Sequence, residues 1–474
     1  MAIATINPAT GETLQTFEPL SDDAVDERIA RAAAAFEGYR LTSPRQRAGW
    51  LRAAADVLDA DAKSVAELMT TEMGKTLASA QAEVGKCAKA LRYYAEHGED
   101  MLQPKPADAQ AVGATEAYVV HQPLGVVLAV MPWNFPLWQA MRFAAPALMA
   151  GNVGLLKHAS NVPQTALYME ELFRKAGFPD DVFQTLLIGS GAVERVLRDD
   201  RVVAATLTGS NAAGQAVATV AGDALKKTVL ELGGSDPFIV MPSADLDRAA
   251  EVAVTARCQN NGQSCIAAKR FFVHADVAEE FTRLFAEKMA ALTVGDPMDE
   301  GTQVGPLATE SGIEDVEGYV QDAVEKGATV VVGGKRVDRP GWFYEPTLVT
   351  DVTPEMGIWS EEVFGPVAAL HTVADLDEAI RLANEHVYGL GSNLWSEDQG
   401  ERLRFIRDIQ SGMAFVNGMT TSYPELPFGG VKQSGYGREL TEVGMYEFCN
   451  AKTVWIGPPS SQQGEGNTAA AASE

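Results

Sequence analysis

The sequence is poor in cysteine and histidine. Its 474 residues include four cysteines, Cys87, Cys258, Cys265 and Cys449, which are far apart and form no CxxC pair. This distribution is not typical of a disulfide framework or a thiolate zinc site, so we expect reduced thiols. The six histidines are also dispersed and include no HExxH motif, so we expect no catalytic metal.

Long apolar runs and basic charge are scarce as well. No apolar stretch approaches the roughly 18 residues of a membrane helix, and the start MAIATINPAT does not resemble an export signal. We therefore expect a cytoplasmic protein without a membrane partner. The formal net charge of -26 opposes binding to nucleic acid. Only 15 of the 38 basic residues are lysine, and two interpretations stay open: an acidic surface adapted to high salt, or an ordinary acidic cytosolic enzyme.

What is present indicates a large α/β protein. With 46% hydrophobic residues, the chain can bury an extensive core and should divide into domains. The first hundred residues predict helices, one of them started by Ser43, Pro44 and Gln46 as N-cap, N1 proline and capping-box partner. From Val126 onward, the apolar runs VVLAVM, VGLL, VVAATL and TVLEL alternate with helical stretches. This alternation predicts βαβ units and a parallel sheet.

A second α/β lobe is expected after the glycine pair Gly233-Gly234, which interrupts the strand that ends at Glu231. The sequence shows no internal repeat of 20 to 50 residues. Residues 459–474 lack apolar periodicity, and we predict that they form a disordered tail.

Three polar residues are candidates for catalysis. Cys265, in NNGQSCIA, is surrounded by small and polar residues that suit close approach of a ligand, although a buried structural cysteine is the alternative. Glu231 ends an apolar strand in VLELGG, where burial would raise its pKa toward that of a general base. Asn134, in MPWNFPLW, follows an apolar strand, and its amide suits an oxyanion or a helix cap.

A phosphate site is suggested by LTGSNAAG. This segment follows a predicted strand and opens a helix, which places Gly209 and Ser210 where backbone N–H groups and the helix dipole favour an anion. It matches neither the Rossmann GxGxxG fingerprint nor the P-loop, so an ordinary helix start is an equally good interpretation.

The motifs MPWNFPLW, LKHAS, LTGS, LELGG, NNGQSC, EEVFGP and PFGGVKQSGYGRE occur in an order and spacing that resemble the aldehyde dehydrogenase superfamily. The resemblance runs from about residue 5 to 458. It implies a Rossmann-like cofactor domain (1–103 and 124–233), an α/β catalytic domain (234–445) and a small β oligomerisation arm (104–123 and 446–458) in a homodimer or homotetramer. It also implies that Cys265 is the nucleophile, Glu231 the base, and Asn134 with the Cys265 N–H the oxyanion hole.

The cofactor implied by the resemblance is NAD or NADP. Many family members carry KPAE where this chain has Lys157-His158-Ala159-Ser160, and their glutamate binds the ribose hydroxyls. Ser160 is small and neutral, so a 2'-phosphate escapes repulsion there and we expect NADP to be preferred. The residues expected to contact the cofactor are Trp133, Lys157, Ser160, Gly209, Ser210, Glu362 and Phe364.

The substrate implied is an aldehyde, and the succinate-semialdehyde dehydrogenase branch is the nearest in motif. Arg142 matches the position where that branch binds the substrate carboxylate, whereas Gln259 stands where some of its members carry a second arginine. Ser422 and Tyr423 are further candidate contacts, and Glu439 is expected to assist proton release. The alternatives are a structural role for Arg142, a broad-specificity dehydrogenase of neutral aldehydes, and a catalytically silent structural or binding protein.

Overall fold

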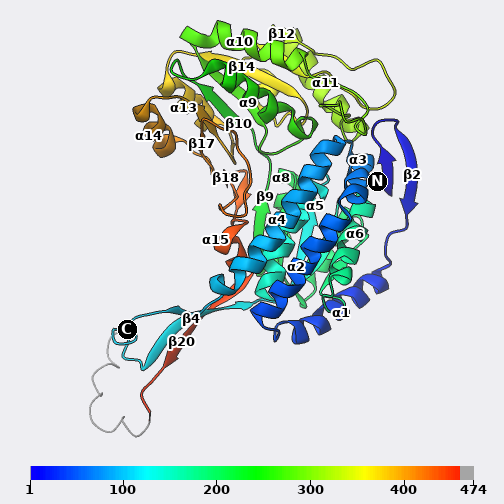
Figure 1. Ribbon diagram of the computed structural model, residues 1–474, viewed down its shortest axis with the longest axis vertical. Helices are drawn as coiled ribbons and strands as arrows, with labels where there is room; N and C mark the ends of the chain where they lie inside the picture. Colours follow the sequence, from blue (N-terminus) through cyan, green and yellow to red (C-terminus); the bar gives the residue numbers. More distant parts are fainter. Residues whose placement is uncertain (1, 460–474) are drawn as a thin grey trace.

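The computed structural model describes residues 2–459 and contains two sheets covered by helices, with a third sheet that extends away from both (Figure 1). Residues 460–474 of the predicted tail lie outside the described residues. The parallel pairing within both large sheets confirms the predicted α/β fold class. No helix among residues 2–459 is long and apolar enough to cross a membrane.

The first large sheet has six strands in the order β19-β9-β8-β5-β6-β7. Five of them are parallel, and only β19 runs antiparallel, against β9. The chain builds β5, β6 and β7 in one direction and then returns to add β8 and β9 on the other side of β5. The strands are β5 (Val126–Met131), β6 (Val153–His158), β7 (Phe183–Thr185), β8 (Val202–Thr208), β9 (Lys227–Glu231) and β19 (Gly435–Tyr436).

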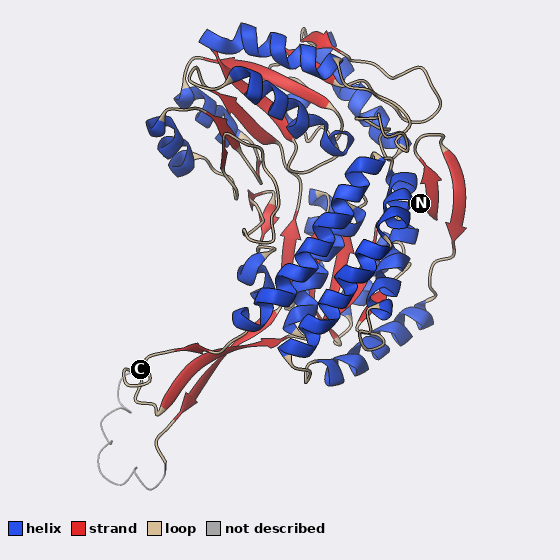
Figure 2. Ribbon diagram, in the orientation of Figure 1, coloured by secondary structure: helices blue, strands red, loops and turns tan. Residues whose placement is uncertain are grey.

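Helices cover this six-stranded sheet, as Figure 2 shows for the long α2 and α4 in front of its strands. The predicted start of α2 is confirmed, because Ser43 and Gln46 form a complete capping box and Pro44 is its first residue. The helices are α1 (Asp22–Tyr39), α2 (Pro44–Ala60), α3 (Ala62–Met73), α4 (Leu77–Met101), α5 (Pro136–Ala150), α6 (Pro163–Lys175), α7 (Val193–Arg198) and α8 (Asn211–Asp223).

The prediction that the first hundred residues are helical was wrong for the N-terminal segment. Strands β1 (Ile3–Asn7) and β2 (Glu12–Phe17) form an antiparallel hairpin. The sequence PATG closes the turn, where Gly11 has a φ of 77° and its N–H donates to the carbonyl of Asn7 at 2.7 Å. The hairpin is also held to the body of the molecule, because the Ala4 N–H donates to the carbonyl of Ser160 at 3.0 Å.

The second large sheet has seven strands in the order β12-β13-β14-β11-β10-β16-β17, and only β12 is antiparallel to its neighbour. Its strands are β10 (Asp236–Val240), β11 (Ala268–His274), β12 (Thr329–Val332), β13 (Thr347–Thr350), β14 (Val367–Val373), β16 (Asn393–Trp395) and β17 (Phe415–Val416). Its helices are α9 (Leu246–Cys258), α10 (Ala275–Ala290), α11 (Glu310–Glu325), α12 (Gly357–Ser360), α13 (Leu376–Glu385) and α14 (Gln399–Asp408).

The third sheet contains β3 (Lys105–Pro106), β4 (Glu116–Pro123) and β20 (Cys449–Ile456), which pair antiparallel in the order β20-β4-β3. Figure 1 shows it projecting from the end of the six-stranded unit. Most side chains of β20 are exposed, including Trp455 and Ile456. The remaining elements are the short pair β15 (Tyr388–Gly389) and β18 (Val431–Lys432), and the helix α15 (Thr441–Tyr446).

Candidate active site

A cavity of about 210 Å³ lies where the two large units meet. Seven predicted site residues line it: Trp133, Asn134, Gly209, Ser210, Cys265, Glu362 and Phe364. Pro132, Gln139, Thr208, Leu232 and Gly233 complete its wall. The structure therefore brings together residues that are up to about 230 positions apart in sequence.

The order of the six-stranded sheet explains this location. The chain leaves β5 toward β6 on one side, whereas β8 lies on the other side of β5. In an open parallel sheet, this reversal leaves a crevice outside the carboxyl ends of the two strands. Asn134 follows β5 and Gly209 follows β8, so both reach the crevice.

The loop that carries Cys265 has an unusual backbone. Asn260, Asn261 and Gly262 have φ values of 54°, 58° and 76°, so three consecutive residues are left-handed. Asparagine tolerates this conformation better than most residues. A Cβ on Gly262 would lie 2.3 Å from the carbonyl carbon of Gly365, so only glycine fits there. The NNG of the sequence motif is therefore needed to form the turn that leads to the thiol.

Asn134 is fixed to that same loop. Its side-chain nitrogen Nδ2 donates to the carbonyl of Gln263 at 3.2 Å, and Nδ2 of Asn260 donates to the Asn134 carbonyl at 2.8 Å. One amide hydrogen of Asn134 is used in this contact and the second remains for a ligand. Because Asn134 and Cys265 line the same cavity, the amide is placed to stabilise charge that develops beside the thiol.

Lys269 was not predicted, although it supports the Cys265 loop. Its buried ammonium donates to the carbonyls of Ser264 at 2.8 Å and Cys265 at 2.9 Å. It also lies 3.5 Å from the Glu362 carboxylate. The available signal was a lysine at the start of the apolar strand AKRFFVH, where a buried charge requires several partners.

Cys265 is half-buried, whereas Cys87, Cys258 and Cys449 are buried. Burial raises the pKa of the Cys265 thiol to about 12, and the positive charge of Arg142 opposes this shift. The thiol is therefore protonated at neutral pH in the protein alone. Attack on a carbonyl requires the thiolate, so the site needs a group that removes this proton.

Glu231 is the last residue of β9 and its carboxylate is buried. Among the described residues, neither of its oxygens has a hydrogen-bond partner. Burial, followed by the nearby charge of Glu439, raises the pKa of Glu231 well above its usual range. The fit depends on Gly429, because a Cβ there would lie 2.6 Å from the Oε1 atom of Glu231. A desolvated carboxylate of this kind is a stronger base than an exposed one.

The β9 strand and the Cys265 loop approach each other closely just after Glu231. A Cβ on Gly234 would lie 2.4 Å from the Cys265 carbonyl oxygen. The N–H of Gly234 donates to Glu362 at 3.1 Å. The glycine pair therefore permits the contact between the two units, and it does not only interrupt the strand as the sequence suggested.

Arg142 and Glu439 form a buried ion pair, with 2.7 Å between Nε and Oε2. The guanidinium also stacks on Phe428, 4.2 Å from the ring centroid. Burial raises the pKa of Glu439 and Arg142 lowers it. Nη2 of Arg142 has no hydrogen-bond partner among residues 2–459. The predicted substrate residue and the predicted proton-release residue thus contact each other, outside the residues that line the cavity.

Other residues that line the cavity are candidates for binding a cofactor. The rings of Trp133 and Phe364 meet edge to face, with 5.7 Å between centroids. Ser210 caps α8 by accepting a hydrogen bond from the Ala213 N–H at 3.3 Å, and the Gly209 N–H donates to the carbonyl of Glu231 at 3.0 Å. A helix start therefore faces the cavity, as the sequence suggested, but the Gly209 N–H is already bonded to Glu231 and is not free for an anion.

Lys157 and Ser160 are near the cavity but do not line it. Lys157 lies near the end of β6, and burial lowers its pKa. His158 accepts from the Ala159 N–H and its Nε2 lies 2.7 Å from the Pro136 carbonyl, so its contacts are structural. Ala159 packs in the same small cluster as Trp133, which links this loop to the cavity wall.

Ser422 is buried and Tyr423 is 42% exposed. The Ser422 hydroxyl accepts hydrogen bonds from the Trp138 indole at 3.0 Å and from Lys86 at 2.7 Å. Ser422 therefore faces the helices α4 and α5, whereas Tyr423 points largely to solvent.

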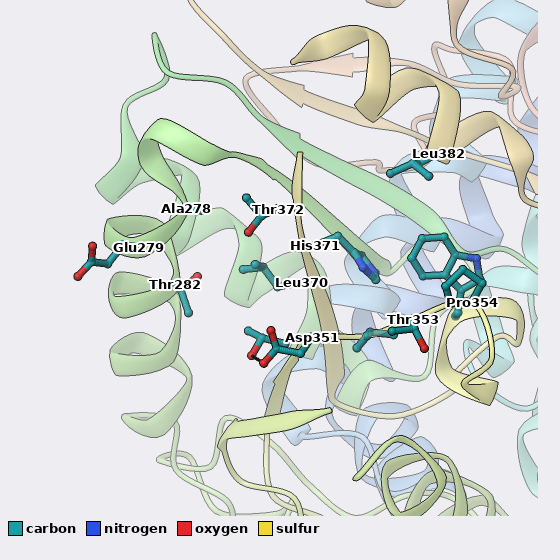
Figure 3. Close-up of a pocket in the computed structure, with 13 residues that line it drawn as sticks. Ala278, Glu279, Thr282, Asp351, Thr353, Pro354, Leu370, His371, Thr372 and Leu382 are labelled. Carbon is teal, nitrogen blue, oxygen red and sulfur yellow. Dashed lines mark hydrogen bonds between the residues drawn. The ribbon is translucent and has the colours of Figure 1, made fainter. Parts of the chain in front are cut away.

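A larger and more open hollow of about 560 Å³ lies on the seven-stranded unit, between α10, β14 and the loop after β13 (Figure 3). Figure 3 labels His371, Asp351 and Thr353 around it. None of the predicted catalytic or cofactor residues is among those that line it. Within residues 2–459, no group of three histidine, cysteine or acidic residues is arranged to hold a metal ion.

Comparison with known proteins agrees with this geometry. Residues 1–454 match the model of the aldehyde dehydrogenase family. The chain is 64% identical over 466 residues to the succinate-semialdehyde dehydrogenase [NADP(+)] of Mycobacterium avium strain 104, and the match covers 98% of each chain. It is also 64% identical over 456 residues to succinate-semialdehyde dehydrogenase [NADP(+)] 1 of Mycobacterium tuberculosis H37Rv, covering 96% of this chain and 100% of that one.

Solved structures give the same result. The crystal structure of succinic semialdehyde dehydrogenase from Streptococcus pyogenes in complex with NADP+ superposes with a TM-score of 0.93 at 39% identity, covering 96% of this chain and 100% of that chain. The corresponding enzyme from Burkholderia pseudomallei gives a TM-score of 0.93 at 36% identity, covering 97% and 95%. The chain therefore belongs to the aldehyde dehydrogenase family.

Proposed function

We propose that this protein oxidises succinate semialdehyde to succinate with NADP, through a thioester on Cys265. The observation that carries the proposal is the shared cavity, in which a half-buried thiol and the Asn134 amide lie at the junction of two α/β units. The relatives named as NADP-dependent succinate-semialdehyde dehydrogenases support the choice of substrate and cofactor.

The proposed reaction begins with removal of the Cys265 proton by Glu231, which does not itself line the cavity but directly precedes the cavity residues Leu232 and Gly233. The thiolate adds to the aldehyde carbon, and the resulting oxyanion accepts a hydrogen bond from Asn134. A hydride then has to leave this carbon, and a bound NADP would supply the acceptor for it. A thioester remains on Cys265. Glu231 passes the thiol proton to solvent and, as a carboxylate again, takes a proton from water while the resulting hydroxide attacks the thioester. The C–S bond then breaks, the thiolate regains a proton, and the carboxylic acid leaves.

The residues near the cavity fit a dinucleotide. Trp133 and Phe364 offer flat apolar surfaces, the α8 start favours phosphate, and the Glu362 carboxylate suits ribose hydroxyls. On this basis we assign the cofactor to the α8 side of the six-stranded unit, with Glu362 and Phe364 supplied by the loop before β14. Lys157 adds a largely buried cation that forms no ion pair with another described residue, as expected for a group that meets an anionic or hydroxyl-rich ligand.

We propose that Ser160 gives the preference for NADP, because it is neutral and lies near Lys157. The change Ser160→Glu introduces a carboxylate that repels the 2'-phosphate and binds ribose hydroxyls. We expect kcat/KM for NADP to fall by about 10- to 100-fold and that for NAD to rise. Steady-state assays with both cofactors measure this. A wild-type enzyme that strongly prefers NAD would contradict the assignment.

Arg142 and Ser422 are the proposed contacts for the substrate carboxylate. The free Nη2 of Arg142 and the Ser422 hydroxyl both suit this anion. The assay compares succinate semialdehyde with butanal, which has the same carbon chain but no carboxylate. A kcat/KM that is at least about tenfold higher for succinate semialdehyde supports the proposal. Equal values would identify a broad-specificity dehydrogenase of neutral aldehydes, and no turnover of either would favour a silent protein.

We also propose a homo-oligomer that works in the cytoplasm. The three-stranded sheet that projects from the molecule, with Trp455 and Ile456 exposed, suits contact with a second copy. The four free cysteines suit a reducing compartment. Light scattering of the purified chain determines the number of subunits, and a monomer at micromolar concentration would contradict the oligomer.

A further inference from the structure

Lys86 is a cation that no motif pointed to. It lies on α4, and its ammonium donates to the Ser422 hydroxyl at 2.7 Å. The same ammonium lies 4.3 Å from the centre of the Trp138 ring. Trp138 also donates its indole N–H to Ser422 at 3.0 Å. Three segments, α4, α5 and the loop before PFGG, therefore meet at the Lys86 ammonium.

The charge of Lys86 has no carboxylate partner. Two lysines at other positions on or beside α4 are paired: Lys75 with Glu83, and Lys89 with Glu425 at 2.7 Å. Lys86 forms no ion pair with any of residues 2–459, and its ammonium contacts a neutral hydroxyl and an aromatic face. Burial and the positive charge of Arg142 lower the pKa of Lys86 to about 8. A partly desolvated cation without an anion is unfavourable, and an anionic ligand would relieve this cost.

Arg142 connects Lys86 to the thiol. Trp138 and Arg142 are four residues apart on α5, so their side chains lie on the same face of the helix. The charge of Arg142 acts on Lys86 and also on Cys265, in both cases lowering the pKa. Gln139, next to Trp138, lines the cavity that contains Cys265. Helix α5 therefore contacts the Lys86 and Ser422 pair through Trp138 and the cavity that contains Cys265 through Gln139.

The charge balance favours Lys86 over Arg142 as the main attraction for an anion. Glu439 neutralises Arg142 at 2.7 Å, so that pair carries no net charge. Lys86 forms no ion pair with a carboxylate among residues 2–459. Gln259, at the position where some members of the succinate-semialdehyde dehydrogenase branch carry a second arginine, is neutral. Of Arg142 and Lys86, only Lys86 is thus without a carboxylate partner among residues 2–459.

We propose that Lys86 is a specificity-determining residue, which with Ser422 binds the terminal carboxylate of a short ω-oxo acid whose aldehyde carbon lies at Cys265. This inference rests on the proposed function. The enzyme needs a positive charge to distinguish succinate semialdehyde from a neutral aldehyde. The proposal places this charge on α4, and not only on α5.

The test replaces Lys86 by Met and by Gln in the full-length enzyme. Lys86→Met removes both the charge and the hydrogen bond. Lys86→Gln removes the charge but keeps a donor near Ser422, so it still tests the proposal if Lys86→Met does not fold. Lys86→Arg keeps the charge. Lys89→Met is the matched control, because Lys89 lies one turn away on α4, is 58% exposed and is paired with Glu425. KM and kcat are measured for succinate semialdehyde and for butanal with saturating NADP, together with KM for NADP.

We expect KM for succinate semialdehyde to rise roughly 10- to 100-fold in Lys86→Met and Lys86→Gln, the size typical for loss of a charged contact. KM for butanal, KM for NADP and the Lys89→Met control should change less than about twofold, and Lys86→Arg should recover most of the affinity. The role of Lys86 is overturned if the wild type prefers succinate semialdehyde but both neutral variants behave like Lys89→Met. It is also overturned if these variants lose butanal oxidation as much as succinate semialdehyde oxidation. If the wild type does not prefer succinate semialdehyde over butanal, the proposed function itself fails.

Discussion

At the residue scale, the reactivity of Cys265 depends on opposing effects of its surroundings. Burial beside the cavity stabilises the neutral thiol and raises its pKa to about 12, whereas the Arg142 and Lys269 charges favour the thiolate. Both cations are themselves engaged, Arg142 by Glu439 and Lys269 by Glu362 and three backbone carbonyls. We therefore expect a thiol that is unreactive at neutral pH until a base or a bound ligand changes its environment.

The pH dependence of alkylation tests this expectation. Below the pKa, the thiolate fraction rises about tenfold for each pH unit, so the rate of Cys265 alkylation by iodoacetamide in the cofactor-free enzyme should rise steadily from about pH 7 to pH 10. Peptide mapping identifies the modified cysteine. A plateau below about pH 9 would mean that the thiol pKa is lower than its burial implies. Cys265→Ala supplies the background rate from the three buried cysteines.

At the element scale, the helix that follows Asn134 is anchored by a side chain from another helix. The N-cap residue of α5, Phe135, makes no side-chain cap. Instead, Oε1 of Glu83 accepts hydrogen bonds from the backbone N–H groups of Leu137 and Trp138 at 2.9 and 2.8 Å. The other carboxylate oxygen of Glu83 forms a buried ion pair with Lys75. Glu83 therefore satisfies the start of α5 and fixes the segment that presents Asn134.

Removal of Glu83 should be costly. Glu83→Ala leaves two helix N–H groups unsatisfied and Lys75 buried without a partner, and we expect unfolding to become easier by about 3–5 kcal/mol. Urea unfolding followed by tryptophan fluorescence measures the change. Adding Lys75→Met to Glu83→Ala removes the unpaired charge and should restore part of the loss. A change below about 1 kcal/mol in Glu83→Ala would show that this anchor is unimportant.

These elements also show how far sequence patterns reach. The βαβ units and the capping box of α2 depend on local apolar spacing and cap residues, and they were predictable. The β1–β2 hairpin was missed because a single short hairpin gives a weak alternation. Lys86, Glu83 and Lys269 were missed because their roles come from contacts with residues that are distant in sequence or with backbone atoms. The motifs around Asn134 and Gly209 were found because they lie on loops that follow strands, and the motif around Cys265 was found because small and polar residues surround the thiol in the loop between α9 and β11.

At the scale of the whole molecule, net charge is the dominant electrostatic feature. The charge of -26 is carried mainly by exposed carboxylates, and many of these pair with arginines on the same helix, such as Arg283 with Glu280 and Glu287. Such exposed pairs contribute little to stability and are weakened by salt. Salt also screens the repulsion among the unpaired carboxylates. Because the net charge is so negative, this screening should stabilise the protein more than the weakening of the ion pairs destabilises it.

Stability should therefore increase with salt. We expect the midpoint of thermal unfolding to rise when KCl is increased from about 0.1 M to about 1 M, over which the screening length falls from about 10 Å to about 3 Å. Differential scanning calorimetry at constant pH measures the midpoint. An unchanged or lower midpoint would contradict a surface adapted to high salt and would support the interpretation as an ordinary acidic enzyme.

The acyl-enzyme tests the central chemical claim most directly. Glu231→Gln removes the proposed base for hydrolysis, so the thioester should accumulate if the Cys265 proton is lost by another route or at raised pH. Intact-mass and peptide analysis after rapid acid quench, with succinate semialdehyde and NADP at alkaline pH, should show a succinyl group on the Cys265 peptide and about one reduced cofactor per subunit. The Cys265→Ala variant should show neither. Turnover of the aldehyde by Cys265→Ala, or a succinyl group on another residue, would contradict the account.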